Sequence, residues 1–529
     1  MLIDIVYLVS VVLLASYGLN AIVMVGLYMS RRRETTVSPI GTDAPSVTVQ
    51  LPIYNEMYVL DRLLAAVVNL DYPQDRLQIQ VLDDSTDETV DLAEELVRQY
   101  VSQGVNIELL HRTNRSGFKA GALKASLPSA SGEYIAIFDA DFVPEPDFLQ
   151  RTIPYFLANP KVGLIQTRWG HVNADYSTLT RAQAIALDGH FVIEQTARNR
   201  SELFMNFNGT AGIWRKSCIE SAGGWQDDTI CEDLDLSYRA QLKGWEFLYL
   251  PDVVVPAEIP PQLNAFKRQQ FRWAKGSMQC AFKLTGTVLR RTDYSWFKRI
   301  QAVLHLTNYS VHPLMVILLL TTLPFILTHS PLSRYVGLLS FASLGPPMLY
   351  AIAQRNIHPD WVKRFTVFPL LMLLGTGIAW SNSRAIWEAI TGRQNQFHRT
   401  PKFRVEGRAD TWADSPYALS FDWDTLGELA LAIYAAVTIV VALQQHNYAV
   451  VPFLIIYLAG FGLVASLDIA HAAKRRPKQP VVEPSVAEPP RLVAKSSVTT
   501  FTPSTTAGQT IYLSHVLQNE EKNPLSKVG

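Results

Sequence analysis

The sequence contains very little cysteine and carries no net charge. Cys218, Cys231 and Cys280 are the only cysteines among 529 residues, and they are far apart and without paired spacing, which argues against a disulfide scaffold or a structural zinc site. All three fall in a part of the chain that we expect in the cytosol, where thiols stay reduced. The 47 basic and 47 acidic residues cancel, so bulk charge supports no nucleic-acid partner and we expect none.

Long apolar runs, by contrast, are abundant, and the first one predicts a membrane anchor. Residues 5–29 are almost uncharged and exceed the roughly 20 residues that cross a bilayer. A signal peptide carries its positive charges before the apolar run, whereas here Asp4 precedes the run and three arginines at 31–33 follow it. We therefore predict a retained anchor rather than a signal peptide or a buried core helix, with the N-terminus outside and the next domain in the cytosol.

Four more apolar runs predict crossings, at residues 304–327, 335–353, 429–443 and 450–467. A sixth run, residues 365–380, is ambiguous. If it crossed, the basic loop 384–408 and the basic cluster 474–476 would both lie outside, against the positive-inside rule. We therefore predict five crossings and one hydrophobic segment that does not cross. No organellar targeting signal is evident, which favours a bacterial plasma membrane.

Between the first two runs, residues 46–258 have the pattern of a soluble α/β domain. Short apolar strands are predicted at 47–51, 77–82, 106–110 and 134–138, and they alternate with helical patterns such as 88–100. This alternation predicts a mostly parallel sheet with helices on both faces. Ligands bind such sheets at the carboxyl ends of the strands.

Two acidic motifs fall at those strand ends. Asp139-Ala140-Asp141 closes the fourth predicted strand, and two carboxylates on one strand-end loop can hold Mg²⁺ or Mn²⁺ against phosphate oxygens. Capping of a loop or helix is the alternative for this pair, and the strand-end position favours the metal. Asp83-Asp84 closes the second strand, where both residues are also good turn and capping material.

Five motifs follow one another in a fixed order between the apolar runs: Asp83-Asp84, Asp139-Ala140-Asp141, Phe207-Asn208-Gly209-Thr210, Cys231-Glu232-Asp233 and Gln269-x-x-Arg272-Trp273. This order resembles the processive family 2 glycosyltransferases, the cellulose synthase and hyaluronan synthase group. The resemblance covers roughly residues 45–470, with the closest local likeness to cellulose-synthase-like mannan and glucan synthases. It implies a GT-A type nucleotide-sugar-binding domain inserted between transmembrane helices.

The resemblance implies which residues bind the donor. Its nucleotide would contact Asp83, Asp84, Tyr54 and Glu56, while Lys119 in the Lys119-Ala120-Gly121 segment and Asp139 would lie near the phosphates. A solvated lysine at a helix start is the alternative for Lys119. Arg272 would stabilise the diphosphate leaving group through charge-assisted hydrogen bonds.

The resemblance also implies a general base, Asp233. Its triplet departs from the usual TED because Cys231 replaces threonine and removes a hydroxyl donor. The carboxylate that would take the proton from the acceptor is retained. Asp235 lies two residues further on and is the alternative base, but the motif match favours Asp233.

Several segments resemble the acceptor side of the synthases. Asn208, Gly209 and Thr210 match the acceptor-end segment, and Gln166-Thr167-Arg168-Trp169 matches a QTP or QARW strand. On a helix, Gln269 and Trp273 would share a face with Arg272, and Trp273 would offer a flat surface to the terminal sugar. An amphipathic interfacial helix is the alternative for this stretch. Residues 397–402 resemble a gating loop whose threonine and lysine approach the nucleotide, although an ordinary basic loop also fits.

The expected layout divides the chain into seven parts: an anchor (1–33), a cytosolic GT-A domain (45–260), interfacial helices (261–300), membrane helices with the ambiguous segment (301–382), a basic cytosolic loop (383–426), a membrane hairpin (427–470) and a disordered tail (471–529). The implied activity is that of an inverting β-glycosyltransferase that uses UDP-glucose or GDP-mannose to extend and translocate a β-1,4-linked mannan, glucomannan or glucan. The runner-up adds one sugar to a lipid such as diacylglycerol or polyprenyl phosphate. A catalytically silent membrane scaffold is the third hypothesis, and the intact set of motifs argues against it.

Overall fold

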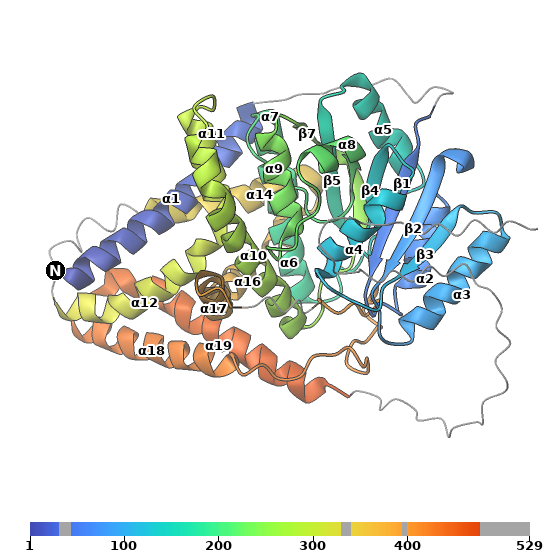
Figure 1. Cartoon of the computed structure of the whole chain (residues 1–529). Helices are drawn as coiled ribbons and strands as arrows, with labels where there is room; N and C mark the ends of the chain where they lie inside the picture. The colour runs from blue at the N-terminus through green and yellow to red at the C-terminus, as the bar shows by residue number, and fades with distance from the viewer. Residues whose placement is uncertain (31–43, 329–339, 394–398, 477–529) are drawn as a thin grey trace, which may run out of the picture.

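The structure, a computed structural model, describes residues 1–30, 44–328, 340–393 and 399–476. The expectations for the arginines at 31–33, for the first residues of the gating-like loop and for most of the tail lie outside these ranges. Figure 1 shows two parts: a sheet with its covering helices on the right, and long helices that extend to the left.

A seven-stranded mixed sheet forms the core of the first part. Its strands are β1 (Val47–Ile53), β2 (Leu77–Asp83), β3 (Ile107–His111), β4 (Tyr134–Ile137), β5 (Val162–His171), β6 (Gly212–Arg215) and β7 (Glu246–Ala257). Their order is β3-β2-β1-β4-β6-β5-β7. All neighbouring pairs are parallel except those of β6, which runs antiparallel to β4 and to β5. The predicted α/β domain and its first four strands are therefore confirmed, and β6 makes the sheet mixed.

Alternation along the strands divides the core between the two faces of this sheet. On β4, Tyr134 and Ala136 join one buried apolar cluster, whereas Ile135 and Ile137 join the other, because successive side chains point to opposite faces. The first cluster is covered by α2 (Leu60–Val68), α3 (Thr89–Ser102) and α5 (Phe148–Ala158); the second is covered by α4 (Phe118–Ser126), α8 (Lys216–Ser221) and α9 (Glu232–Leu242). Helices therefore cover both faces, as the sequence predicts.

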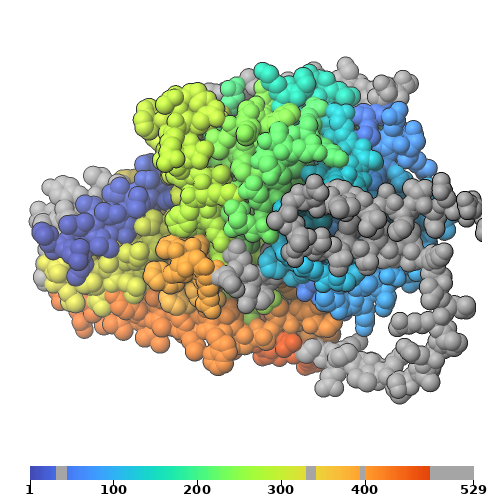
Figure 2. Space-filling model, in the orientation of Figure 1, coloured from blue at the N-terminus to red at the C-terminus, as the bar shows by residue number. Residues whose placement is uncertain are grey.

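Four helical stretches in the described ranges are long and apolar enough to cross a membrane: Leu2–Ser30, Asn308–Leu327, Thr425–Gln444 and Tyr448–Lys474. They contain α1 (Leu2–Ser30), α12 (Val311–Leu327), α18 (Thr425–Gln444) and α19 (Val451–Lys474), of which α1 packs on α12 and α18 packs on α19. Figure 2 shows these segments, in dark blue, yellow and orange, along the left and lower sides of the molecule. Four of the five predicted crossings thus correspond to helices that have the required length and composition.

The remaining two apolar runs have a different form. The run 335–353 lies partly outside the described residues, and its described part forms η5 (Ser340–Leu344) and the start of α14 (Gly345–Ile357). The run 365–380 falls on a broken stretch, α15 (Trp361–Phe365), α16 (Phe368–Gly377) and α17 (Ala379–Ile390), bent by 41° at the break before α17. A pair of helices bent in this way suits either a broken span or a re-entrant segment. The predicted crossing at 335–353 and the predicted non-crossing segment at 365–380 therefore stay predictions.

The two parts of the molecule are joined by α10 (Leu263–Arg290) and α11 (Trp296–Leu306), and by α6 (Thr178–Asp188), the π-helix η3 (Gly189–Gln195) and α7 (Thr196–Arg200). On α10, Lys267 forms an ion pair of 2.6 Å with Glu428 of α18, and the two side chains are 1% and 0% exposed. A buried charge is stable only when it is paired. This pair therefore fixes the N-terminal part of α10 against α18, one of the helices long and apolar enough to cross a membrane.

Candidate active site

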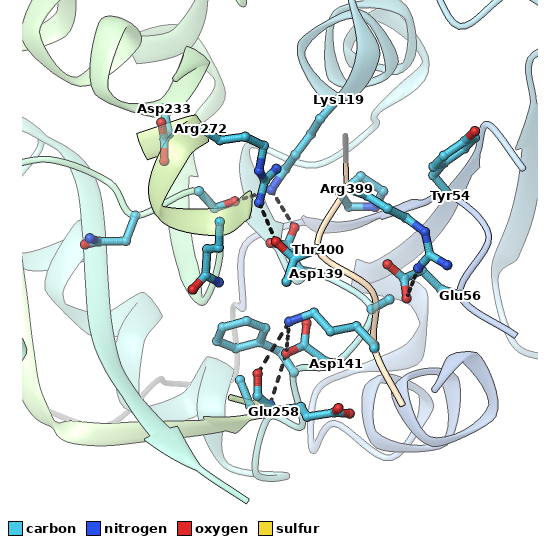
Figure 3. Close-up of a pocket in the computed structure, with 18 of the residues that line it drawn as sticks. Tyr54, Glu56, Lys119, Asp139, Asp141, Asp233, Glu258, Arg272, Arg399 and Thr400 are labelled. Carbon is cyan, nitrogen blue, oxygen red and sulfur yellow. Dashed lines mark hydrogen bonds and ion pairs between the residues drawn. The ribbon is translucent and has the colours of Figure 1, made fainter. Parts of the chain in front are cut away.

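A cavity lies at the carboxyl ends of β1, β2 and β4, where the sequence predicts ligand binding. It is lined by twelve of the predicted site residues: Tyr54, Glu56, Asp84, Lys119, Asp139, Asp141, Asn208, Gly209, Asp233, Gln269, Arg272 and Trp273. Figure 3 shows Asp233 and Arg272 on one side, Glu56 and Arg399 on the other, and Asp139 between them. The structure thus brings together residues that lie more than 200 positions apart in the sequence.

Each aspartate of the pair after β4 contacts a lysine. Asp139 Oδ1 lies 2.5 Å from Lys119 Nζ, and Asp141 Oδ2 lies 2.7 Å from Lys402 Nζ. The Asp141 side chain is 2% exposed and also accepts a hydrogen bond from the backbone N–H of Glu258, whereas that of Asp139 is 38% exposed. Two cations therefore balance the charge of this pair.

The same two carboxylates fit a hard divalent cation. No group of three or more His, Cys, Asp or Glu side chains within the described ranges is arranged to hold a metal ion. Mg²⁺ and ions like it are commonly bound by one or two carboxylates together with water and substrate phosphates rather than by a closed protein cage. Asp139 and Asp141, which both line the cavity, have the donor chemistry for that kind of site.

The two aspartates after β2 point in different directions. Asp83, the last residue of β2, is fully buried; its carboxylate lies 2.7 Å from His111 Nδ1 and accepts a hydrogen bond from the N–H of Ser85. Asp84 lines the cavity and binds Arg112 through both carboxylate oxygens, at 2.7 and 2.5 Å. Burial raises the pKa of Asp84. The structure therefore places Asp84 in the cavity and Asp83 behind it.

Beside Asp84, an arginine covers the aromatic ring expected at the nucleotide. The guanidinium of Arg115 lies 3.3 Å from the centre of the Tyr54 ring, a cation–π arrangement. On the same side of the cavity (Figure 3), Glu56 forms a 2.9 Å ion pair with Arg399, and burial raises the pKa of Glu56 to about 7. Neither arginine was predicted as a site residue. Arg399 falls within the segment that resembles a gating loop, but no local signal in the sequence marks Arg115.

Residues 399–406 cross the cavity, although they are distant in the sequence from the other residues that line it. We call this segment the strap. Thr400 accepts a hydrogen bond from Arg272 at 3.1 Å, and Lys402 contacts Asp141. The strap is held by Glu258, whose carboxylate accepts hydrogen bonds of 2.9 Å from the backbone N–H groups of Phe403 and Arg404. Burial raises the pKa of Glu258 to about 7. Glu258 directly follows β7, a strand-end position like that of the aspartate motifs, and this signal could have identified it.

Asp233 lies in the first turn of α9, facing the cavity. Its Oδ1 accepts a hydrogen bond of 2.8 Å from the N–H of Leu234, but burial dominates and raises its pKa to about 6. The neighbouring Glu232 has its pKa raised to about 7, also by burial. The alternative base, Asp235, is instead fully buried and forms ion pairs with Arg239 and Lys283. Asp233 is therefore the better placed of the two to exchange a proton with a ligand.

The loop before β6 packs directly against Asp233. Gly209 has a φ of +82°, and a Cβ on it would lie 3.0 Å from Asp233 Oδ2. Its carbonyl accepts a hydrogen bond from Lys119 at 2.8 Å. Thr210 is fully buried and does not line the cavity; its Oγ1 accepts a hydrogen bond from the N–H of Asp139. Thr210 thus holds the loop that carries Asp139 and Asp141 from behind.

The helix predicted for Gln269, Arg272 and Trp273 is confirmed as part of α10, and all three residues line the cavity. Burial lowers the pKa of Arg272, although a guanidinium keeps its charge at physiological pH. The Arg272 side chain reaches toward Asp139 and Thr400 (Figure 3). The Arg272 guanidinium therefore faces Asp139, one of the two carboxylates suited to a metal ion that also binds phosphate.

Comparison with known proteins agrees with this arrangement. Residues 44–276 match the family described as "Glycosyltransferase like family 2". Glucomannan 4-beta-mannosyltransferase 9 of Arabidopsis thaliana is 46% identical over 269 residues, which are 50% of this chain and 50% of that protein. Glucomannan 4-beta-mannosyltransferase 1 of Oryza sativa subsp. japonica is 43% identical over 312 residues, 56% of this chain and 59% of that one. The chain thus spans about half the length of the curated relatives it matches.

A solved structure shares the fold. The mannosyltransferase PcManGT from Pyrobaculum calidifontis, in complex with GDP-Man and Mn²⁺, superposes with a TM-score of 0.50 at 19% sequence identity, covering 74% of this chain and all of that one. At this identity the likeness concerns the fold alone. The family match is confined to residues 44–276, and the mixed sheet and this likeness agree with a GT-A type fold for that part of the chain.

Proposed function

We propose that the protein is an inverting β-glycosyltransferase that uses UDP-glucose or GDP-mannose to extend a β-1,4-linked mannan, glucomannan or glucan. The observation that carries the proposal is the single cavity in which a carboxylate pair, a cation and a candidate base converge: Asp139 and Asp141, Arg272, and Asp233. The similarity to glucomannan 4-beta-mannosyltransferases supports the polymer class.

The donor would bind across the ends of β1, β2 and β4. Tyr54, Asp84 and Glu56 line the side suited to the nucleotide, and Asp83 supports Asp84 from behind. Asp139 and Asp141 would hold Mg²⁺ or Mn²⁺, which when bound neutralises the diphosphate charge. Lys119 and Arg272 add positive charge on the same side, so the diphosphate becomes a better leaving group.

Asp233 would act as the general base. Its carboxylate accepts the proton of an acceptor hydroxyl, whose oxygen then forms a bond to the anomeric carbon while the bond from that carbon to the diphosphate breaks on the opposite face. The configuration at the anomeric carbon is therefore inverted. A pKa of about 6 leaves the carboxylate ionised at neutral pH and basic enough to take the proton.

The acceptor would lie toward α10. Gln269 and Trp273 line this side of the cavity, and Asn208 and Gly209 complete it next to Asp233. Because α10 is anchored to membrane helix α18 through Lys267, an acceptor on its face is close to the membrane part. We propose that the product leaves through the membrane helices, with the GT-A domain on the cytosolic side.

The test uses the full chain in nanodiscs with Mn²⁺ and one radiolabelled donor at a time: UDP-glucose, GDP-mannose, GDP-glucose or UDP-N-acetylglucosamine. We expect one donor to give high-molecular-weight material that a mannanase or a cellulase degrades. A small, lipid-extractable product would overturn the polymer proposal in favour of a lipid acceptor. The absence of any donor hydrolysis that depends on a divalent cation would leave a silent scaffold.

A further inference from the structure

The end of the cavity beyond Asp139 is formed by β5. In the sheet, β1 and β2 lie on one side of β4, while β6 and β5 lie on the other. The cavity therefore runs from Tyr54 and Asp84, past Asp139, to the carboxyl end of β5, where it is lined by Trp169 and His171. This end lies away from the residues that suit a nucleotide.

Trp169 and His171 share a face of β5 because they are two residues apart on a strand. Gly170 between them also lines the cavity, but a Cβ on it would point toward β7, 2.8 Å from Val254 Cγ1. The Trp169 ring packs against Phe142 and Phe191, with ring centres 5.2 and 5.0 Å away. The indole is thus held rigidly as an apolar wall beside the imidazole of His171.

The imidazole of His171 is oriented by a buried carboxylate. Asp188, the last residue of α6, lies with its Oδ1 3.1 Å from His171 Nε2, and its Oδ2 accepts a hydrogen bond of 2.7 Å from Gln354 and lies 3.8 Å from His358 Nε2. Burial opposes its charge, but the hydrogen bonds from His171 and Gln354 and the nearby His358 keep the pKa of Asp188 below its usual range. An ionised carboxylate only accepts hydrogen bonds, so Nε2 of His171 carries a proton.

The other ring nitrogen of His171, Nδ1, is a hydrogen-bond acceptor in the tautomer whose only proton is on Nε2. Within the described ranges Nδ1 makes no hydrogen bond, and the residue lines the cavity. A free acceptor atom beside an apolar ring is suited to a sugar, which offers hydroxyl donors and apolar C–H faces. In that tautomer it is not suited to a phosphate, because an acceptor atom repels the oxygens of an anion and neither Trp169, Gly170 nor the adjoining Leu187 supplies a cation.

We propose that His171 and Trp169 form an acceptor-sugar subsite, in which a hydroxyl of a neutral glycan donates a hydrogen bond to His171 Nδ1 while the sugar ring packs against Trp169. Asp188 is a positioning residue that fixes the tautomer of His171. The inference rests on the proposed function, and it narrows the acceptor to a glycan rather than a lipid phosphate.

Three variants of the full chain in nanodiscs separate the two nitrogens of His171. His171→Gln keeps a polar atom where Nε2 contacts Asp188 but loses the acceptor at Nδ1, whereas His171→Asn keeps a polar atom near Nδ1. His358→Gln is the matched control, because His358 also approaches Asp188 but does not line the cavity. The probes are mannotetraose and cellotetraose, with binding followed by calorimetry and acceptor use followed as KM and kcat.

We expect His171→Gln to weaken binding of the preferred tetraose by about tenfold, the value of one hydrogen bond, and to raise its KM by the same factor. The KM of the nucleotide-sugar donor and the kcat at saturating acceptor should stay unchanged, a split that general destabilisation would not give. His171→Asn should lie between His171→Gln and wild type, and His358→Gln should match wild type.

The outcomes separate this inference from the proposed function. If wild type extends a tetraose and His171→Gln binds it as wild type does, the subsite is refuted and the function stands. If His171→Gln weakens donor binding as strongly as tetraose binding, the residue is structural and the subsite is again refuted. If wild type binds neither tetraose and transfers sugar only to lipid, the polymer function and the subsite fall together.

Discussion

At the end of the cavity proposed for the donor, acidic side chains are paired with cations, whereas at the end proposed for the chemistry Glu232 and Asp233 make no ion pair among the described residues. Asp139, Asp141 and Glu56 contact Lys119, Lys402 and Arg399, respectively. Asp233 and Glu232 instead have pKa values raised to about 6 and about 7 by burial. In the proposed mechanism, the same residue type would hold cations next to an anionic ligand at one end and would accept a proton at the other.

The largest effect is expected from removing the proton acceptor. Asp233→Asn keeps the shape of the side chain but cannot take a proton, so kcat should fall by roughly 10²- to 10⁴-fold while nucleotide binding is retained. Initial rates and calorimetric titration with the nucleotide measure the two quantities. Asp235→Asn serves as the comparison: if it abolishes transfer per folded molecule while Asp233→Asn remains active, the base is Asp235.

A smaller effect should follow from crowding the base without removing it. Gly209→Ala places a Cβ 3.0 Å from Asp233 Oδ2 at a φ of +82°, and a left-handed conformation costs an L-residue roughly 1–2 kcal/mol. If Asp233 shifts by a few tenths of an ångström to relieve the contact, kcat should fall by roughly tenfold, because a misplacement of about 1 Å can cost about 10²-fold.

Gly104 provides the matched control for Gly209→Ala. It has a similar φ of +86°, but a Cβ there would meet nothing within 4 Å. Gly104→Ala should therefore show similar backbone strain with an unchanged kcat per folded molecule. Equal losses of kcat in the two variants would mean that strain, rather than contact with Asp233, explains the effect.

The pH dependence of the wild type tests the same end of the cavity. Burial raises the pKa of Asp233 to about 6, and the base is active only when ionised, so activity should be present above that pH and lost as the pH falls through it. At pH 5 the rate should be about one tenth of its plateau value. A kcat that stays flat down to pH 4.5, with the protein still folded, would contradict the raised pKa.

The strand-end motifs could be predicted from the sequence because they depend only on residues that are neighbours in the chain. A short continuous apolar run predicts β4, and the Asp139-Ala140-Asp141 motif follows this run directly. The direction of each side chain was harder to predict, since consecutive residues at the end of β2 face opposite ways: Asp84 enters the cavity and Asp83 binds His111. The strap was not predictable as a whole, because Glu258 and the backbone it holds are 145 residues apart and only tertiary folding brings them together.

The smallest effect is expected at the end of the cavity where each carboxylate is paired with a cation. Lys402 neutralises Asp141 at 2.7 Å, and a divalent cation at Asp141 must displace or share that contact. Lys402→Met removes the competitor, so Mn²⁺ should bind more tightly in the absence of nucleotide, by about 1 kcal/mol or roughly fivefold. Titration of Mn²⁺ followed by electron paramagnetic resonance measures this affinity without any turnover.

A control for Lys402→Met lies two residues further along the strap. Arg404 pairs with Asp61 where both side chains are nearly half exposed, and Arg404 does not line the cavity, so Arg404→Met should leave Mn²⁺ affinity unchanged. If both variants change the affinity equally, the net charge of the strap matters rather than the contact with Asp141. If Lys402→Met binds Mn²⁺ more weakly than wild type, the lysine supports the metal site instead of competing for it. The ion pairs would then overstate the difference between the two ends of the cavity.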